Sequence, residues 1–270
     1  MLRKLWAFYK RDSQIAFSNR FQFFYSAGQA IFSLVSFFLI GKLVTQQSGM
    51  NPYLAPYQGD YFRFVLTGVA FSGFMTTALG SFSQMIQFER WHGTLEEILL
   101  TPTSLIAMAL GKTFWNLTAQ LGQVGLYLLA GVVLFRVDLS RANWPALIPT
   151  ILLTTGTFLG IGMIFAGCSL LWREDGMMES LFGGASRFLA GIYFPVAILP
   201  QGLRVISNYL PLTYSLEAMR KSLLEGTSAQ ALGKELTVLS GFSLIFLPTG
   251  FLFFRWALRT ARRQGTLALT

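Results

Sequence analysis

The chain has 270 residues, of which 53% are hydrophobic and 12% charged, and its formal net charge is +9. Several apolar runs exceed about 18 residues, the length typical of membrane-spanning helices, so the composition indicates an integral membrane protein and excludes a soluble globular domain. The cations flank these runs and no soluble basic domain is long enough to use them. We therefore assign them to membrane orientation and lipid headgroups, and we expect no nucleic-acid partner.

Residues 1–20 have the pattern of an amphipathic helix lying along the cytoplasmic membrane surface. One face is apolar or small and consists of Leu2, Leu5, Trp6, Tyr9, Ser13, Ala16 and Phe17. The cations lie mostly on the other side of the helix and are Arg3, Lys4, Lys10 and Arg11. The pattern fits a basic anchor and a specific docking element equally well.

The remainder predicts an all-α membrane domain over residues 21–260, followed by a cytoplasmic tail over 261–270. Six runs are long enough to cross a hydrocarbon core of about 30 Å: 24–44, 62–86, 105–135, 146–172, 177–199 and 237–257. Lys and Arg crowd both chain ends, whereas 45–61 has none. We therefore expect a multi-pass protein of a bacterial-type inner membrane, with both termini in the cytoplasm.

A charged, helix-capped segment stands between the second and third runs. Thr94 and Glu97 have the spacing of a capping box, Gly93 permits a turn before it, and Pro102 ends the helix. An isolated helix this short is marginal in water, so we expect it to dock on a partner. The residues that we expect to couple to that partner are Glu89, Arg90, Thr94, Leu95, Glu96, Glu97, Ile98 and Leu99.

Two features stand out inside the fourth and fifth runs. Small residues (Gly156, Gly160, Gly162 and Gly167) form a face that permits close helix packing, and we expect contacts within the chain rather than between subunits. Arg187 lies about eight residues inside the fifth run, where a charge is costly. It is either a functional residue or one held by a partner on another span for packing alone.

The segment after the fifth run predicts two short helices on the outer side. Prolines at 195, 200 and 211 break the chain, and Leu203, Ile206 and Leu210 make the first helix amphipathic. The second should run from about 213 to 224 and stop at Gly226. We expect a re-entrant pair that acts as an outer gate, with Pro195, Pro200, Leu203, Ile206 and Pro211 as its residues.

Catalysis by the chain itself is not expected. His92 and Cys168 are the only histidine and cysteine, so we expect no metal site and no nucleophile–base pair. The sequence Gly111-Lys112-Thr113 lacks the upstream glycine of a phosphate-binding loop, because residue 106 is Ile. A passive channel or secondary carrier is less favoured, since the acidic residues lie at span ends or in loops.

The chain resembles the permease subunits of ABC-2 type transporters. Three parts carry the resemblance: the basic amphipathic start, the stretch 89–102, which resembles the family's cytoplasmic coupling helix, and 194–220, which is similar to its outer re-entrant segment. The resemblance implies two permease chains, with a homodimer favoured over a heterodimer, and two separate cassette ATPases that bind ATP and Mg. The permease itself would bind no cofactor.

The resemblance leaves several cargoes open. The Phe-rich spans and small outer loops favour an amphipathic or hydrophobic cargo, such as a drug or lipid, with Arg187 and Phe194 as candidate residues of its path. The alternative is a lipid-linked polysaccharide such as O-antigen or teichoic acid.

Overall fold

The computed structural model describes residues 6, 9–11, 13–14, 20–45, 54, 60–93, 105–172 and 176–264. Within these ranges the fold is all-α, as predicted, and contains no strand. The long helices are α2 (Arg20–Thr45), α4 (Tyr61–Trp91), α6 (Leu105–Phe135), α7 (Trp144–Trp172) and α11 (Gly233–Gln264). The short ones are α8 (Met177–Leu189), the 3-10 helix η2 (Val196–Ile198), α9 (Gln201–Asn208), α10 (Pro211–Arg220) and the π-helical turn η3 (Lys221–Glu225).

Five described helices, α2, α4, α6, α7 and α11, are long and apolar enough to cross a membrane. They coincide with five of the six predicted runs. Helix α4 continues past the predicted end at 86 to Trp91, and α11 continues to Gln264, inside the predicted tail. Both extensions carry charged residues, so hydropathy alone does not detect them. The predicted interface helix over 1–20 lies largely outside the described residues, although Tyr9 packs edge-on against Trp115 of α6, with ring centroids 5.5 Å apart.

The predicted fifth span, 177–199, is wrong as a single helix. Helix α8 has 13 residues and ends at Leu189, and Gly191 follows with a φ of +82°, a backbone conformation that favours glycine. At 1.5 Å per residue, α8 reaches only about 20 Å, too short for a hydrocarbon core of about 30 Å. The residues after the break are still apolar, which is why the sequence reads as one continuous run.

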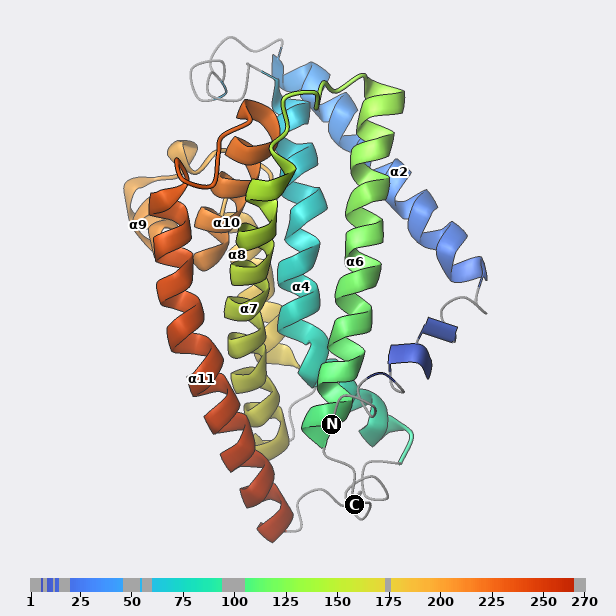
Figure 1. Cartoon of the computed structure of the whole chain (residues 1–270), viewed down its shortest axis with the longest axis vertical. Helices are drawn as coiled ribbons and strands as arrows, with labels where there is room; N and C mark the ends of the chain where they lie inside the picture. The colour runs from blue at the N-terminus through green and yellow to red at the C-terminus, as the bar shows by residue number, and fades with distance from the viewer. Residues whose placement is uncertain are drawn as a thin grey trace.

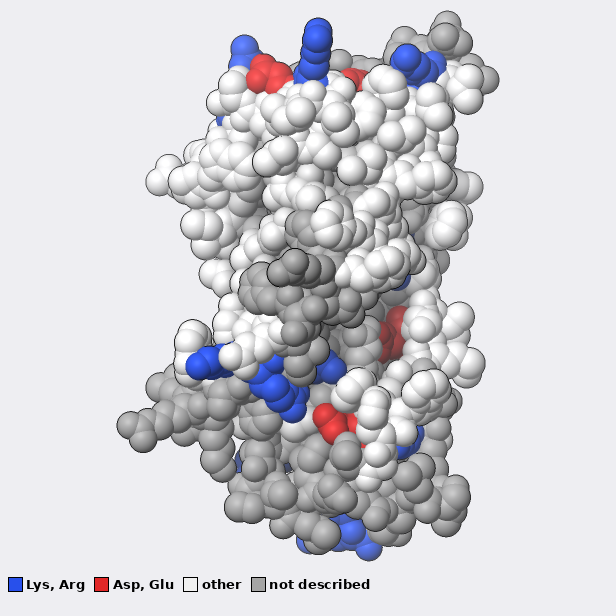
Figure 2. Space-filling model, turned by 90° about the vertical axis from the view of Figure 1, so that its right-hand side faces the viewer, with Lys and Arg blue, Asp and Glu red and all other residues white. Residues whose placement is uncertain are grey.

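Helix α4 is the central helix of the bundle. In Figure 1 it lies between α6 and α7, and α11 packs on the far side of α7. In the most apolar 18-residue stretch of α4, 72% is buried inside the protein, whereas the corresponding buried share is 18% in α2 and 11% in α11. On the face shown in Figure 2, a broad band nearly free of charged side chains separates a rim of mixed charge from a lower region where Lys and Arg lie together with some Asp and Glu. That band is the pattern expected of a membrane-exposed surface.

The small-residue face on α7 packs within the chain, as predicted. A Cβ at Gly160 would stand 2.3 Å from the Phe246 carbonyl of α11, and one at Gly162 would stand 2.3 Å from the Leu79 carbonyl of α4. Gly156 and Gly167 likewise face α11. The glycines therefore let α7 approach both neighbours at backbone distance.

Candidate functional site

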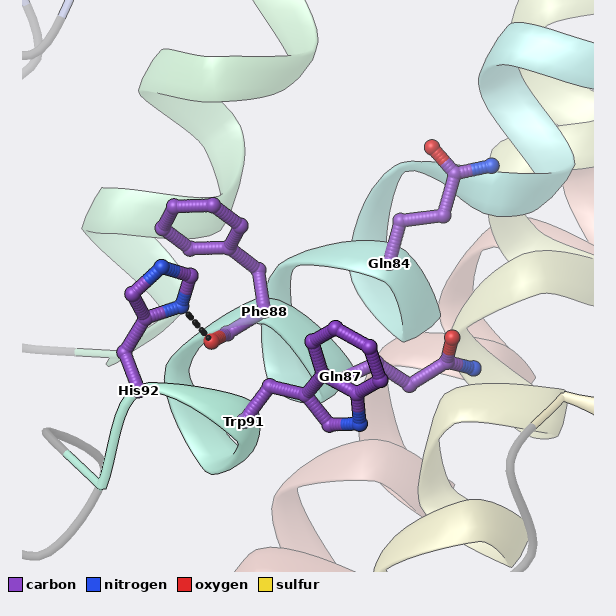
Figure 3. Close-up of a pocket in the computed structure, with 5 residues that line it drawn as sticks. All are labelled: Gln84, Gln87, Phe88, Trp91 and His92. Atoms are coloured by element: carbon purple, nitrogen blue, oxygen red, sulfur yellow. Dashed lines mark hydrogen bonds between the residues drawn. The ribbon is translucent and has the colours of Figure 1, made fainter.

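The C-terminal end of α4 closes in the turn that the sequence predicts. The His92 backbone N–H donates to the Phe88 carbonyl, and Nδ1 of the same residue lies 2.8 Å from that oxygen (Figure 3). Gly93 follows with a φ of +68°, which confirms its expected role in the turn. The predicted short helix that follows lies outside the described residues, and with it Thr94, Leu95, Glu96, Glu97, Ile98 and Leu99.

The other two predicted coupling residues lie in the last turns of α4. Glu89 is 8% exposed and faces the bundle, where it has interaction partners. Arg90 donates through Nη2 to the Ser169 carbonyl of α7, at 3.4 Å. The structure therefore places both side chains against the helical bundle.

A cavity of ≈ 390 Å³ lies along the opposite face of this helix end, lined by Gln84, Gln87, Phe88, Trp91 and His92. Figure 3 shows these side chains projecting from successive turns of α4. Trp91 is 92% exposed, and the Lys112 ammonium of α6 lies 4.7 Å from the centre of the Phe88 ring. The cavity thus combines aromatic rings with two carboxamides, a composition suited to a ligand that is both polar and apolar.

The cavity borders a polar contact between α4 and α8. Gly80 leaves room there: a Cβ on it would stand 2.3 Å from Gln84 Nε2 and 2.8 Å from Glu179 Oε1. The Ser83 hydroxyl lies within interaction range of the Glu179 carboxylate. However, Ser83 Oγ and Glu179 Oε2 are buried without a completed hydrogen bond. Because buried polar atoms are normally paired, this contact, which we call the α4–α8 seam (Gly80, Ser83, Gln84 and Glu179), needs an explanation.

The predicted path residues Arg187 and Phe194 lie near the far end of α8. Arg187 is in the last turn of the helix, so its expected depth of about eight residues from either span end is wrong, because α8 stops at Leu189. A cation at this end is favourable toward the helix dipole. Its Nε is buried without a partner, and no hydrogen bond or ring contact joins it to Phe194, whose ring instead lies 6.5 Å from that of Phe188.

The two short helices that the sequence predicts after the fifth run are present, each begun by a proline as predicted. Pro200 directly precedes α9, and Pro211 is the first residue of α10. Pro195 directly precedes η2. The apolar side chains Leu203, Val205 and Ile206 of α9 are exposed, and so is Tyr209 directly after it. The π-helical turn η3 continues α10 to Glu225, and Gly226 follows with a φ of +71°, which confirms the expected stop.

Helices α9 and α10 differ in how firmly they are held by the rest of the chain. The buried Ser215 of α10 receives a 2.8 Å hydrogen bond from Thr154 of α7. Lys221, just after α10, forms ion pairs with Glu235 of α11 at 2.7 Å and with Glu217 at 2.9 Å. Burial opposes its charge, but hydrogen bonds to both carboxylates raise the pKa of Lys221 above its ordinary value. Helix α9 is fastened mainly by Ser207, which donates to the Leu189 carbonyl.

Arg220, at the end of α10, joins that helix to α4 and to the turn after α8, and was not singled out in the sequence. It is 4% exposed, and its guanidinium carbon lies 3.6 Å from the centre of the Phe64 ring of α4. Nη2 donates to the Gly191 carbonyl at 2.7 Å, and Nε to the Phe64 carbonyl at 3.3 Å. Gly68 permits this approach, since a Cβ there would stand 2.7 Å from Nη2. The signal available in the sequence was a cation inside the second predicted short helix (about 213–224).

Comparisons with known proteins place this arrangement among transporters. The sequence model of the family described as ABC-2 type transporter matches residues 3–224. Nodulation protein J of Sinorhizobium fredii is 28% identical over 193 residues, which cover 70% of this chain and 68% of that protein. Nodulation protein J of Rhizobium meliloti is 27% identical over 204 residues, covering 72% and 74%. Heme exporter protein B of Haemophilus influenzae is 29% identical over 136 residues, covering 50% and 57%.

Proposed function

Because this chain belongs to the ABC-2 type transporter family, whose members are multi-pass permeases, we propose that it forms the membrane path of an ATP-driven exporter. Two copies would enclose the path, and two separate cassette ATPases would bind ATP and Mg. Both termini would lie in the cytoplasm, where the basic chain ends favour them. The cargo would be an amphipathic or hydrophobic molecule that leaves the cytoplasm or the inner leaflet.

The continuity of α4 carries this proposal. This 31-residue helix has the predicted ATPase-docking segment, 94–101, directly after its C-terminal turn, and its N-terminal half holds Arg220 of the outer region. A helix packed on this scale is stiff, so a push on the segment after Gly93 would displace α4 as a unit. One element thereby connects the expected site of ATP-driven motion with the expected outer gate.

The polar seam and the cavity support an amphipathic cargo. They place carboxamides, a carboxylate and two aromatic rings near the predicted cytoplasmic end, where a molecule leaving the inner leaflet would enter. Arg187 lies about 12 Å farther along α8 from Glu179, at 1.5 Å per residue, and is our candidate contact for a cargo with an anionic group.

The test is reconstitution of the permease with its cassette ATPase in lipid nanodiscs. We expect a stable complex whose ATP hydrolysis rises when amphipathic cargo is added, whereas an ATPase variant unable to hydrolyse ATP shows neither hydrolysis nor transport in matched vesicles. Transport that proceeds without ATP or without an ATPase subunit would instead indicate a passive channel or secondary carrier.

Arg187→Gln separates two roles of that arginine. Lower transport of anionic cargo with an intact permease dimer supports a cargo contact, whereas loss of the dimer supports a role between the chains. A variant unchanged in both measurements would make Arg187 an ordinary packing residue.

The gate proposal is narrower than the sequence suggested: α9 and η2 would move, and α10 would stay fixed. Val205 of α9 is 57% exposed and Ala218 of α10 is fully buried. With Cys168 replaced, a cysteine at 205 should react with a membrane-impermeant reagent at a rate that changes when ATP is trapped, and a cysteine at 218 should stay protected. Equal, nucleotide-independent labelling at 205 and its neighbours would indicate an ordinary surface loop.

A further inference from the structure

The α4–α8 seam contains two buried oxygen atoms that complete no hydrogen bond, although the Ser83 hydroxyl lies within interaction range of the Glu179 carboxylate. Glu179 Oε2 is buried and unpaired, although a carboxylate oxygen is costly to bury alone. Ser83 is fully buried and its Oγ is also unpaired. Two orphaned oxygens on facing helices, at a point where Gly80 removes the intervening side chain, outline a small site rather than a packing defect.

The chemistry of the seam selects a donor. An ionised carboxylate only accepts hydrogen bonds, and the hydroxyl and the carboxamide oxygen of Gln84 can accept them as well. An ammonium group brings three donors, no acceptor and a compensating positive charge. A phosphate, sulfate or carboxylate would meet the Glu179 charge at close range, and no Lys or Arg among the described residues forms an ion pair with that carboxylate. The nearest cation along α8, Arg187, is about 12 Å away at 1.5 Å per residue.

The adjoining cavity suits the rest of such a molecule. Gln84 belongs to both places, since its amide lies over Gly80 and its side chain lines the cavity. Below it, the exposed ring of Trp91 can cover an apolar chain or attract a cation. The Phe88 ring already has the Lys112 ammonium 4.7 Å from its centre and adds apolar surface to the cavity. The volume of ≈ 390 Å³ falls within the range of small-molecule sites, about 300–1,000 Å³.

We propose that the α4–α8 seam, together with this cavity, binds the protonated amine of an amphipathic molecule, with Glu179, Ser83 and Gln84 receiving the ammonium and the rings of Phe88 and Trp91 covering the apolar part beside it. The inference deepens the proposed export function by naming a cargo class, and rests on it for its physiological meaning. Binding itself requires no ATP, and so can be measured on the permease alone.

The test uses the purified permease in nanodiscs and tritiated dodecylamine, with binding to empty nanodiscs subtracted. Unlabelled dodecylamine should displace the probe at least tenfold more effectively than dodecanol or dodecyl sulfate. Glu179→Gln keeps the size but removes the charge, and should weaken binding at least tenfold. Gly80→Ala should weaken it similarly, because its methyl group occupies the space between Gln84 and Glu179.

Gly184→Ala, on the same helix as Glu179, is the matched control: its Cβ would meet nothing within 4 Å, so binding should not change. Variants are compared only when they elute as wild type in size exclusion, and Ser83→Ala replaces any that does not. Unchanged binding by both Glu179→Gln and Gly80→Ala, or equal displacement by dodecanol, would overturn the proposal. If the amine binds but no ATPase complex forms, the proposed export function is contradicted and the amine site is not. If the complex exports other cargo and the amine does not bind, only the amine site is contradicted.

Discussion

Replacing Arg220 by Met tests whether the buried guanidinium fixes α10 to α4 and to the turn after α8. Met keeps much of the apolar volume but leaves the Gly191 carbonyl without its 2.7 Å donor and the Phe64 ring without its cation. A charged hydrogen bond contributes about 1.5–3 kcal/mol and a desolvated cation–π contact about 2 kcal/mol. Relief of the buried charge offsets part of this, so we expect a net loss of about 2–4 kcal/mol.

The measurement is reversible unfolding of the permease in mixed micelles, from which the free energy of unfolding is obtained for each variant. Arg204→Met is the matched control, because Arg204 lies on the exposed α9 and donates to the Ala197 and Leu199 carbonyls. It should shift the free energy by no more than about 0.5 kcal/mol. An Arg220→Met variant as stable as this control would refute the idea that Arg220 holds the outer region together.

Three further predictions concern coupling, packing and pH. Replacing Glu96 and Glu97 together by Ala should weaken the cap by about 0.5–2 kcal/mol and lower cargo-stimulated ATP hydrolysis; full stimulation and complex yield would contradict ATPase docking by this segment. Gly160→Ala should destabilise the fold by about 1–3 kcal/mol, because the added methyl group would meet the backbone of α11. Gly122→Ala is the control and should not destabilise it, because a Cβ there meets nothing within 4 Å. Equal free energies of unfolding for the two variants would argue against close α7–α11 packing. Because the pKa of Lys221 is raised, its ion pairs stabilise the protein fully below the ordinary lysine pKa of 10.5, and this contribution is lost as the pH rises above that value. Lys221→Met should remove this part of the loss of stability at alkaline pH. An unchanged dependence of the unfolding free energy on pH would contradict this prediction.

Local patterns in the sequence were sufficient for several parts of this protein. Apolar runs of sufficient length predicted five spanning helices, since burial in a membrane demands a continuous apolar stretch. The turns at Gly93 and Gly226 were also predictable, because a left-handed backbone after a helix favours glycine whatever lies around it. The small-residue face of α7 was recognisable as a packing surface for the same kind of local reason.

The break after α8 required the tertiary structure. Hydropathy measures side chains, and the residues after Leu189 are as apolar as those before it, so the run over 177–199 resembles one span. The chain turns at Gly191 because Arg220, far along the sequence, binds its carbonyl and Ser207 binds that of Leu189. These long-range hydrogen bonds satisfy backbone groups that a continuing helix would have paired internally.

The candidate cargo site also depended on the tertiary structure. Sequence reasoning chose Arg187, because a charge inside an apolar run is visible along the chain, and it passed over Glu179, which stands at the edge of one. Only the packing of α8 on α4 brings the Glu179 carboxylate over Gly80, beside Ser83. Whether a polar side chain is solvated or buried without a partner depends on the residues that face it across the helix contact. Residues about a hundred positions apart face each other only once the chain has folded.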